Sequence, residues 1–324
     1  MDVLITEEME APAFLRLNEH YQVAWETNLW REPGRLKATI PYAKVLMVRN
    51  QTQVTADVLD AATELKAVVR VGVGLDNIDV PAATQRGIVV VAPLDANAGS
   101  VAELTMAFIL ALARKIVPGD RATKAGKWDR KSCTGFEIDG KTITICGFGR
   151  IGRLVAARAR AFGMKIVVYD PFVKPGAESL KTVGAVLCES LEGAVSLGDF
   201  VSSHSPLTPE TKHMFNAGVF KAMKQGAYFI NTSRGGVVDE AALYDALKRG
   251  HLGGAALDVR EKEPPVTRLG FEDLDNIILA PHIGAFTVEA QNRTAEAVVA
   301  DTERLLQGKA AVNFVNFAEP RRKQ

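Results

Sequence analysis

The stretch TITICGFGRIG, residues 142–152, decides the fold of this chain. A short run rich in β-branched residues leads directly into glycines at positions 147, 149 and 152, and the helix-like segment RLVAARARAF follows. In such a strand–loop–helix unit the first glycine allows a tight turn, the second leaves the loop backbone open, and the third lets the helix pack closely on the strand. The stretch therefore predicts the opening unit of a doubly wound parallel sheet.

The next apolar run, KIVVYD, ends in Asp170. Backbone N–H groups at the start of the helix after the glycine loop would bind a pyrophosphate. A carboxylate that ends the second strand accepts hydrogen bonds from the adenosine ribose of NAD and repels the 2′-phosphate of NADP. The pattern predicts an NAD site that includes Gly147, Gly149, Gly152 and Asp170; the alternative is a glycine-rich turn with an unrelated acid.

Apolar runs alternate with helix-like segments in two series, on either side of a long apolar helix at 101–116. Such alternation is typical of parallel strands joined by crossover helices. We therefore expect an α/β protein with two doubly wound parallel sheets. The runs of the first series start at residues 3, 45, 68 and 88, and those of the second at 142, 165, 199, 227, 254 and 276.

The C-terminal segment, residues 287–308, has helical periodicity. Thr287 is a candidate N-cap and Gly308 a candidate end of the helix. Either predicted sheet could receive its apolar stripe, and the pattern does not choose between them. The predicted stripe consists of Val288, Ala295, Val298, Thr302 and Leu305.

The helix at 101–116 carries apolar side chains around most of its circumference and ends in Arg114 and Lys115. It is shorter than the roughly 20 residues of a membrane-spanning helix, so we expect a buried helix and no membrane insertion. One sheet cannot cover all of its faces. We therefore predict that part of this helix forms the interface of a homodimer.

The charge balance excludes a general attraction to nucleic acid or to an anionic membrane surface, since 39 basic residues face 38 acidic ones. The three cysteines, Cys133, Cys146 and Cys188, show no metal-ligand spacing and are predicted to be reduced core residues, without a metal site. The N-terminal MDVLITEEME lacks the pattern of a secretory signal. These features predict a cytoplasmic protein that binds small molecules.

Three chemically capable side chains follow strands of the second series. Arg234 follows AYFINTS, Glu263 lies in EKEPP after GAALDV, and His282 lies in LAPHIGAFT. Taken singly they could be a turn residue, a solvated loop charge and a loop histidine. Because ligands of open α/β sheets bind at the carboxyl ends of the strands, their common position predicts a site with a base, a group that orients it and a cation for a substrate anion.

The ordered motifs GRIGR, YDP, SPLTPET, INTSRGGVVDE, GAALDV, EPP and PHIGA resemble the D-isomer-specific 2-hydroxyacid dehydrogenase family. The segments RVGVGLDNIDVPAA and GKWDRKSCTGFEIDGKT are most similar to its phosphoglycerate-oxidising members. The resemblance implies a substrate-binding domain from residues 1–98 and 286–324, a Rossmann NAD-binding domain from residues 99–285, and an active site in the cleft between them. Because the chain stops at residue 324, with no room for the C-terminal regulatory domains of long family members, we expect a short form without serine feedback.

The resemblance assigns a role to each of the three strand-end residues. His282 would be the general acid and base, Glu263 would hydrogen-bond it and stabilise its protonated form, and Arg234 would bind the carboxylate and carbonyl oxygen of the substrate. The implied cofactor positions are Gly147, Gly149, Arg150, Ile151, Gly152, Asp170, Ser205, Pro206, Thr232, Ser233, Asp258, Gly284 and Ala285. The implied substrate positions are Arg49, Val73, Gly74, Arg234 and His282.

Two positions bear on the substrate. Arg49 lies where phosphoglycerate enzymes have a phosphate-binding arginine, although it could also be a solvated strand-end residue, and the VGVG glycines could merely relieve a turn. Phe286 stands where these enzymes usually have a small hydroxyl residue. We expect NAD-dependent interconversion of a small D-2-hydroxy acid and its 2-oxo acid, first of all 3-phosphoglycerate and 3-phosphohydroxypyruvate of serine biosynthesis. The alternatives are a reductase of hydroxypyruvate, glyoxylate or another 2-oxo acid, and an NAD(H)-sensing binding protein of the corepressor type.

Overall fold

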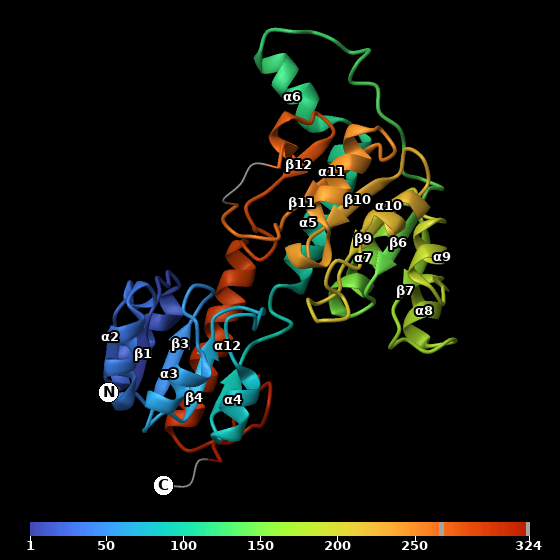
Figure 1. Cartoon of the computed structure of the whole chain (residues 1–324). Coiled ribbons are helices and arrows are strands. Elements are labelled where there is room, and N and C mark those ends of the chain that lie inside the picture. Colours follow the sequence, from blue (N-terminus) through green and yellow to red (C-terminus); the bar gives the residue numbers. More distant parts are fainter. Residues whose placement is uncertain (266–268, 322–324) are drawn as a thin grey trace. The chain divides into compact units, whose positions relative to one another are not determined.

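The computed structural model describes residues 1–265 and 269–321 of the 324-residue chain. The chain divides into two compact units, one formed by residues 1–97 together with 286–324, the other by residues 98–285 (Figure 1). The boundaries expected from the sequence lie within one residue of these. Each unit is built on its own parallel sheet.

The first unit contains a five-stranded sheet in the order β2-β1-β3-β4-β5. All described residues of β1, β3, β4 and β5 are buried, because helices cover both faces of the sheet. The apolar runs predicted these four strands, but not the half-buried edge strand β2. The strands are β1 (Val3–Ile5), β2 (Val23–Trp25), β3 (Val45–Val48), β4 (Ala67–Arg70) and β5 (Val89–Val91).

The helices of the first unit form two cores with the sheet. One face packs against η1 (Pro12–Phe14), α1 (Leu15–His20) and the C-terminal α12 (Val288–Leu306). The other face is covered by η2 (Leu29–Arg31), α2 (Pro33–Thr39), η3 (Ile40–Tyr42), α3 (Ala56–Ala61) and α4 (Val80–Gln85).

The first unit is therefore the host of the C-terminal helix. Thr287 caps α12 by accepting a hydrogen bond from the Ala290 N–H, as the sequence predicts. The predicted stripe is buried except at Val288, which is 74% exposed. That assignment was wrong, because helical periodicity locates an apolar stripe but not how far along the helix the covering surface extends.

The second unit contains seven parallel strands in the order β12-β11-β10-β9-β6-β7-β8. The strand order reverses between β6 and β9, which is the point where ligands of doubly wound sheets bind. Six of the strands were predicted, whereas the two-residue edge strand β8 was not. The strands are β6 (Thr142–Cys146), β7 (Lys165–Tyr169), β8 (Val186–Leu187), β9 (Phe200–Ser203), β10 (Tyr228–Asn231), β11 (Gly254–Leu257) and β12 (Ile277–Leu279).

Helices cover both faces of this sheet as well. One face packs against α5 (Ala98–Ala113), α7 (Arg150–Ala161) and α8 (Glu178–Val183). The other packs against α9 (Leu191–Val195), α10 (Ala217–Ala222), η4 (Gly235–Val237), α11 (Glu240–Lys248) and η5 (Phe271–Asp273).

The long apolar helix α5 ends at Ala113, earlier than predicted, and the separate helix α6 (Ile116–Lys124) follows Lys115, which has a φ of 50°. Besides packing on the sheet, α5 packs against α7, and Leu104 and Leu110 contact the core of the unit. The apolar circumference of α5 is thus largely covered within its own unit. It does not by itself require a second subunit.

Within the described parts of the chain, no helix combines the length and apolar character needed to cross a membrane. The described residues also contain no group of three or more His, Cys, Asp or Glu side chains arranged to hold a metal ion. The cysteines are free; Cys146 is buried, but Cys133 and Cys188 are only partly buried, so the prediction of core positions is correct for Cys146 alone.

Candidate active site

Each of the three glycines in the β6–α7 loop meets a different structural constraint. Gly147 has a φ of 94°, and a Cβ atom there would lie 2.8 Å from the carbonyl carbon of His204 in the loop after β9. A Cβ at Gly152, the third residue of α7, would collide with the carbonyl oxygen of Gly147, so the helix can pack this closely on the loop only with a glycine there. Gly149 has open space around it. These are the conditions that a loop approaching a pyrophosphate requires.

Asp170 follows β7 and holds the same loop. Its Oδ2 accepts a hydrogen bond from the Phe148 N–H at 2.7 Å, and its Oδ1 accepts one from the Phe172 N–H at 2.9 Å. A carboxylate has about four acceptor positions. Asp170 therefore keeps capacity for the two hydroxyls of a ribose, and no side chain caps the N-terminus of α7 at Gly149. The donors and acceptors of this loop fit NAD.

The other predicted positions near the cofactor lie on the same carboxyl edge of the sheet. Arg150 and Ile151 form the first turn of α7, and Ser205 donates to the Cys146 carbonyl at 3.3 Å, with Pro206 exposed beside it. Thr232 is buried and hydrogen-bonds Thr105 of α5 at 2.9 Å between their hydroxyl oxygens. The ends of β6, β7, β9 and β10 thus bring these residues to one rim.

Arg234 follows β10 in a loop that Asn231 organises. The Asn231 Oδ1 accepts hydrogen bonds from the N–H and hydroxyl of Ser233, at 3.0 and 2.8 Å, and its Nδ2 donates to the Arg234 carbonyl at 2.9 Å. The Ser233 hydroxyl also contacts that of Ser203 at the end of β9, at 3.0 Å. The backbone on both sides of the Arg234 side chain is therefore fixed.

His282 lies just after β12 in an uncommon backbone conformation. Its φ is 56°, a left-handed value that costs a residue with a side chain roughly 1 kcal/mol. Its N–H donates to the Asp258 carbonyl at 2.7 Å, and the Asp258 carboxylate accepts from the N–H groups of Ile283 and Gly284, at 2.7 and 2.8 Å. Asp258 is 1% exposed and directly holds the strained turn, including Gly284 and the neighbouring Ala285.

Glu263 and His282 form a close pair in the structure. The distance from Glu263 Oε2 to His282 Nδ1 is 2.6 Å, while Glu263 Oε1 accepts from the Arg260 N–H at 3.0 Å. Burial alone would raise the pKa of Glu263, but the hydrogen bonds from His282 and Arg260 and the charges of His282 and Arg234 together lower it below its usual value. An ionised carboxylate on Nδ1 leaves Nε2 of the imidazole for a substrate.

Arg49 belongs to the first unit, in a loop after β3 that a buried acid holds. Glu7 is 2% exposed, and its carboxylate accepts four consecutive backbone N–H groups, those of residues 49–52, at 2.8 to 3.2 Å. The Asn77 amide donates to the carbonyls of Arg49 and Thr52 at 3.0 and 2.7 Å. The Arg49 guanidinium lies 5.6 Å from the centre of the Phe286 ring, which is 60% exposed.

Val73 and Gly74 lie in the loop after β4, where both are partly buried. The preceding Gly72 has a φ of 151°, and a Cβ there would come 2.5 Å from Arg70 Nη1. Arg70 is largely buried and donates to the Val71 carbonyl at 2.8 Å. The loop therefore wraps closely around the Arg70 guanidinium, and the φ of Gly72, which side chains rarely adopt, favours glycine at this position.

Several residues that shape the site were not predicted from the sequence. Glu7, Glu240 and Arg260 act on backbone or side-chain partners 20 or more residues away, so no local pattern reveals them. For Glu7 the sequence signal was an acid two residues after a buried strand, as in LITE. His204 is also close to the loops; its Nε2 contacts the Ser202 hydroxyl at 2.9 Å, and burial lowers its pKa to about 3, so it is uncharged near neutrality.

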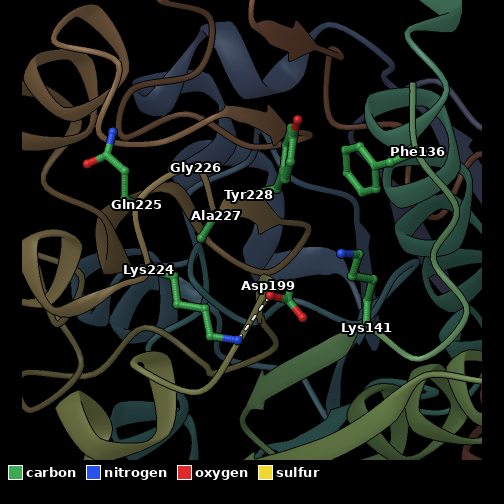
Figure 2. A pocket seen from close by; sticks show the side chains of 8 residues that line it. All are labelled: Phe136, Lys141, Asp199, Lys224, Gln225, Gly226, Ala227 and Tyr228. Atoms are coloured by element: carbon green, nitrogen blue, oxygen red, sulfur yellow. Dashed lines mark hydrogen bonds and ion pairs between the residues drawn. The ribbon is translucent and has the colours of Figure 1, made fainter. Parts of the chain in front are cut away.

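A cavity of about 360 Å³ lies at the opposite, amino edge of the second sheet (Figure 2). Lys224 and Asp199 pair across it at 3.0 Å, and Asp199 also accepts from the N–H of Thr142, the first residue of β6. Burial alone would raise the pKa of Asp199, but these two partners lower it. The cavity is remote from the carboxyl strand ends and contains none of the predicted site residues.

Comparison with known proteins identifies the family. Residues 106–284 match the NAD binding domain of the D-isomer specific 2-hydroxyacid dehydrogenases. A D-3-phosphoglycerate dehydrogenase of Methanocaldococcus jannaschii is 44% identical over 97% of this chain, and one of Archaeoglobus fulgidus is 42% identical over 98%. The chain spans 59% of the length of each.

A solved structure of Aquifex aeolicus D-lactate dehydrogenase, complexed with NAD and lactic acid, superposes with a TM-score of 0.88 at 31% identity. The match covers 97% of this chain and 99% of that one. The predicted fold and family are thereby confirmed. The chain belongs to the D-isomer specific 2-hydroxyacid dehydrogenase family.

Proposed function

We propose that this chain catalyses the NAD-dependent interconversion of a small D-2-hydroxy acid and its 2-oxo acid, with 3-phosphoglycerate and 3-phosphohydroxypyruvate as the favoured pair. The observation that carries the proposal is the 2.6 Å contact between Glu263 and His282, on strand ends of the same sheet that bears Arg234 and the glycine loop. A base, its orienting acid and a cation are what the removal of a hydroxyl proton from an anionic substrate requires.

In the oxidative direction, Nε2 of His282 accepts the hydroxyl proton while hydride leaves C2 of the substrate. NAD, when bound, supplies the nicotinamide that takes up the hydride. The ionised Glu263 carboxylate stabilises the imidazolium that forms on His282. Arg234 pairs with the substrate carboxylate through its planar guanidinium and polarises the developing carbonyl. In the reductive direction His282 returns the proton.

For the cofactor, we propose that the β6–α7 loop binds the pyrophosphate and Asp170 the adenosine ribose. Ser205 and Pro206 would flank the adenine side. The remaining contacts would come from the rim around the nicotinamide. The full proposed set is Gly147, Gly149, Arg150, Ile151, Gly152, Asp170, Ser205, Pro206, Thr232, Ser233, Asp258, Gly284 and Ala285.

For the substrate, we propose that Val73 and Gly74 bind the carboxylate through their backbone and that Arg49 binds the phosphate. The Glu7 clamp supports the second assignment, because it fixes the backbone of Arg49 without using its guanidinium. A preorganised cation loses less entropy on binding an anion. The phosphoglycerate dehydrogenases among the relatives agree with this choice.

A second candidate is an unphosphorylated acid such as hydroxypyruvate, glyoxylate or lactate. The Phe286 ring beside Arg49 favours it, because an apolar group next to the cation competes with a phosphate for that face. NADH formation measured with phosphorylated and unphosphorylated 2-hydroxy acids separates the two candidates. Turnover of none of them, with NAD binding intact, would sink both and favour the NAD(H)-sensing alternative.

We also propose that the chain works as a cytoplasmic homodimer. The free cysteines agree with a reducing compartment. The self-association surface would extend from α5 to the segment after it, where α6 has no buried residue and Trp128 is 80% exposed. Sedimentation of the wild type and of Trp128→Glu tests this: a dimer that the substitution weakens supports the proposal, and a monomeric wild type refutes it.

A further inference from the structure

The ion pair between Glu240 and Arg260 lies outside the proposed catalytic set but contacts it through the backbone of Arg260. Glu240 is the first residue of α11, and Arg260 lies three residues before Glu263 in the loop after β11. Arg260 Nε donates to Glu240 Oε1 at 2.8 Å and Nη2 donates to Oε2 at 3.2 Å. The two side chains are only 9% and 7% exposed. A two-pronged pair of this kind has both strength and a fixed orientation.

Because the pair is buried, desolvation of both charges opposes its formation, and removal of one partner would leave an unpaired buried charge that destabilises the fold more strongly. Taking both charges out of water is repaid only by close geometry and by further hydrogen bonds. Both conditions are met here, since Glu240 Oε1 also accepts the Glu261 N–H at 2.9 Å and the Arg260 guanidinium lies 5.0 Å from the centre of the buried Phe271 ring. The pair therefore anchors the side chain of Arg260 and the backbone that follows it.

The backbone anchored in this way contacts the active-site loops. The Arg260 N–H donates to Glu263 Oε1, and Glu263 Oε2 contacts His282 Nδ1. In addition, a Cβ at Gly235 would collide with the Arg260 carbonyl group, so the residue after Arg234 packs directly on the same peptide. One short segment thus contacts the supports of all three proposed functional side chains.

We infer that the buried Glu240–Arg260 ion pair positions Glu263 and, through it, His282. Glu240 and Arg260 are then positioning residues of the proposed dehydrogenase, and the inference rests on that proposed function for its kinetic consequence. Its structural consequence is independent of turnover. While Glu263 accepts a hydrogen bond from Nδ1, neutral His282 is kept as the Nδ1–H tautomer. If Glu263 loses this position, His282 is expected to populate both the Nδ1–H and the Nε2–H tautomers.

The test compares Arg260→Met with Arg249→Met. Arg249 pairs with Asp245 on the same helix α11 at 3.1 Å, but its side chain is 77% exposed. Arg260→Met is expected to lower kcat by about 10- to 100-fold while KM for NAD stays unchanged, because the reacting groups are misplaced and the cofactor loop is not touched. Arg249→Met is expected to behave as the wild type.

The second readout is the tautomer of His282 in ¹⁵N-histidine spectra, assigned by its loss in His282→Asn. The wild type and Arg249→Met should show the Nδ1–H form, whereas Arg260→Met should show a mixture with the Nε2–H form. If Arg260→Met does not fold, the double variant Glu240→Gln with Arg260→Met leaves no unpaired buried charge and carries the same expectations. A single Nδ1–H tautomer together with wild-type kcat in these variants overturns the inference.

A wild type without turnover on any 2-hydroxy acid would refute the proposed function instead. The tautomer comparison then still decides the inference: a mixture in Arg260→Met supports positioning by the ion pair, and an unchanged Nδ1–H form refutes it.

Discussion

Two loops of this protein are held by buried carboxylates, and they differ in what the carboxylate holds. Glu7 in the first unit accepts the N–H groups of four consecutive residues and so fixes one continuous loop that carries Arg49. Asp258 in the second unit accepts two N–H groups of the turn after His282. That turn also contains a strained residue and depends on further contacts through Glu263 and Arg260.

The difference fits the chemical role that we propose for each loop. A cation that binds an anionic group needs a stable place but tolerates variation in its side chain, since attraction between charges depends weakly on direction. A base that takes a proton in a transition state needs an orientation defined to a fraction of an ångström. One clamp suffices for the first task, whereas the second needs several loops that support one another.

The largest effect on catalysis is expected at His282, whose turn and side chain are held by Asp258 and Glu263. His282→Asn removes the proposed base and should lower kcat by about 10³-fold, or about 4 kcal/mol of barrier, without weakening NAD binding. Steady-state kinetics and NAD titration measure the two effects. The matched control is His213→Asn, since His213 also has a left-handed φ of 50° and pairs with a glutamate, Glu261, at 2.9 Å. Equal losses in both variants would contradict the assignment.

Glu7→Gln tests whether the first loop depends on a single carboxylate. The substitution replaces an acceptor oxygen by an N–H donor that faces backbone N–H groups, and it should lower the free energy of unfolding of the first unit by about 3 kcal/mol. Urea unfolding measures this effect. Glu8→Gln, at the exposed neighbouring position, should change it by less than about 0.5 kcal/mol. A loss of similar size in Glu8→Gln would show that the clamp is not the cause.

Arg49→Met tests whether the loop after β3 binds the phosphate of the substrate through Arg49. If Arg49 binds the phosphate, KM for 3-phosphoglycerate should rise about tenfold relative to KM for glycerate, which corresponds to about 1.4 kcal/mol. Arg31→Met is the control, because Arg31 also stacks on an aromatic ring, Trp30, at 4.6 Å. Equal changes of KM for both acids in Arg49→Met would argue against a phosphate contact.

The smallest effect is the contribution of Glu263 to stability. A carboxylate whose pKa is lowered by folding stabilises the protein above its ordinary pKa of 4.5, and this stabilisation is lost as the pH falls through the lower folded-state value. Because the side chain is 36% exposed, solvent screening reduces the contribution to about 0.5 kcal/mol. The free energies of unfolding of wild type and Glu263→Gln should therefore differ at pH 6 and converge as the pH falls through the lowered folded-state pKa of Glu263. A difference in the free energy of unfolding that grows on acidification would have the opposite sign and would contradict a stabilising role of the Glu263 carboxylate.

The sequence predicted most of the fold because the central strands are buried on both faces and therefore appear as continuous apolar runs. It did not reveal β2 and β8, which are short edge strands with partly exposed residues. The dimer interface predicted on α5 stays a prediction. The sequence of that helix alone could not show that α7 covers part of its apolar circumference.

The candidate site likewise contains residues that the sequence could predict and residues that it could not. The glycine loop, Asp170 and the strand-end residues could be proposed as site residues because each stands next to a recognisable strand or motif. The residues that hold them could not, because Glu7 and Glu240 act on partners that only the fold brings close. Nor could the sequence show that Asp258, expected near the cofactor, also holds the turn of His282.

The Glu7 clamp has a consequence for how this protein can change. Its carboxylate binds only backbone groups of residues 49–52, and the side chains of Asn50 and Gln51 are exposed. Substitutions at these two positions can therefore alter the loop surface while leaving the hydrogen bonds that fold it in place. On the proposal that Arg49 binds the substrate, single substitutions at these two positions are expected to change the acid preference with little loss of stability.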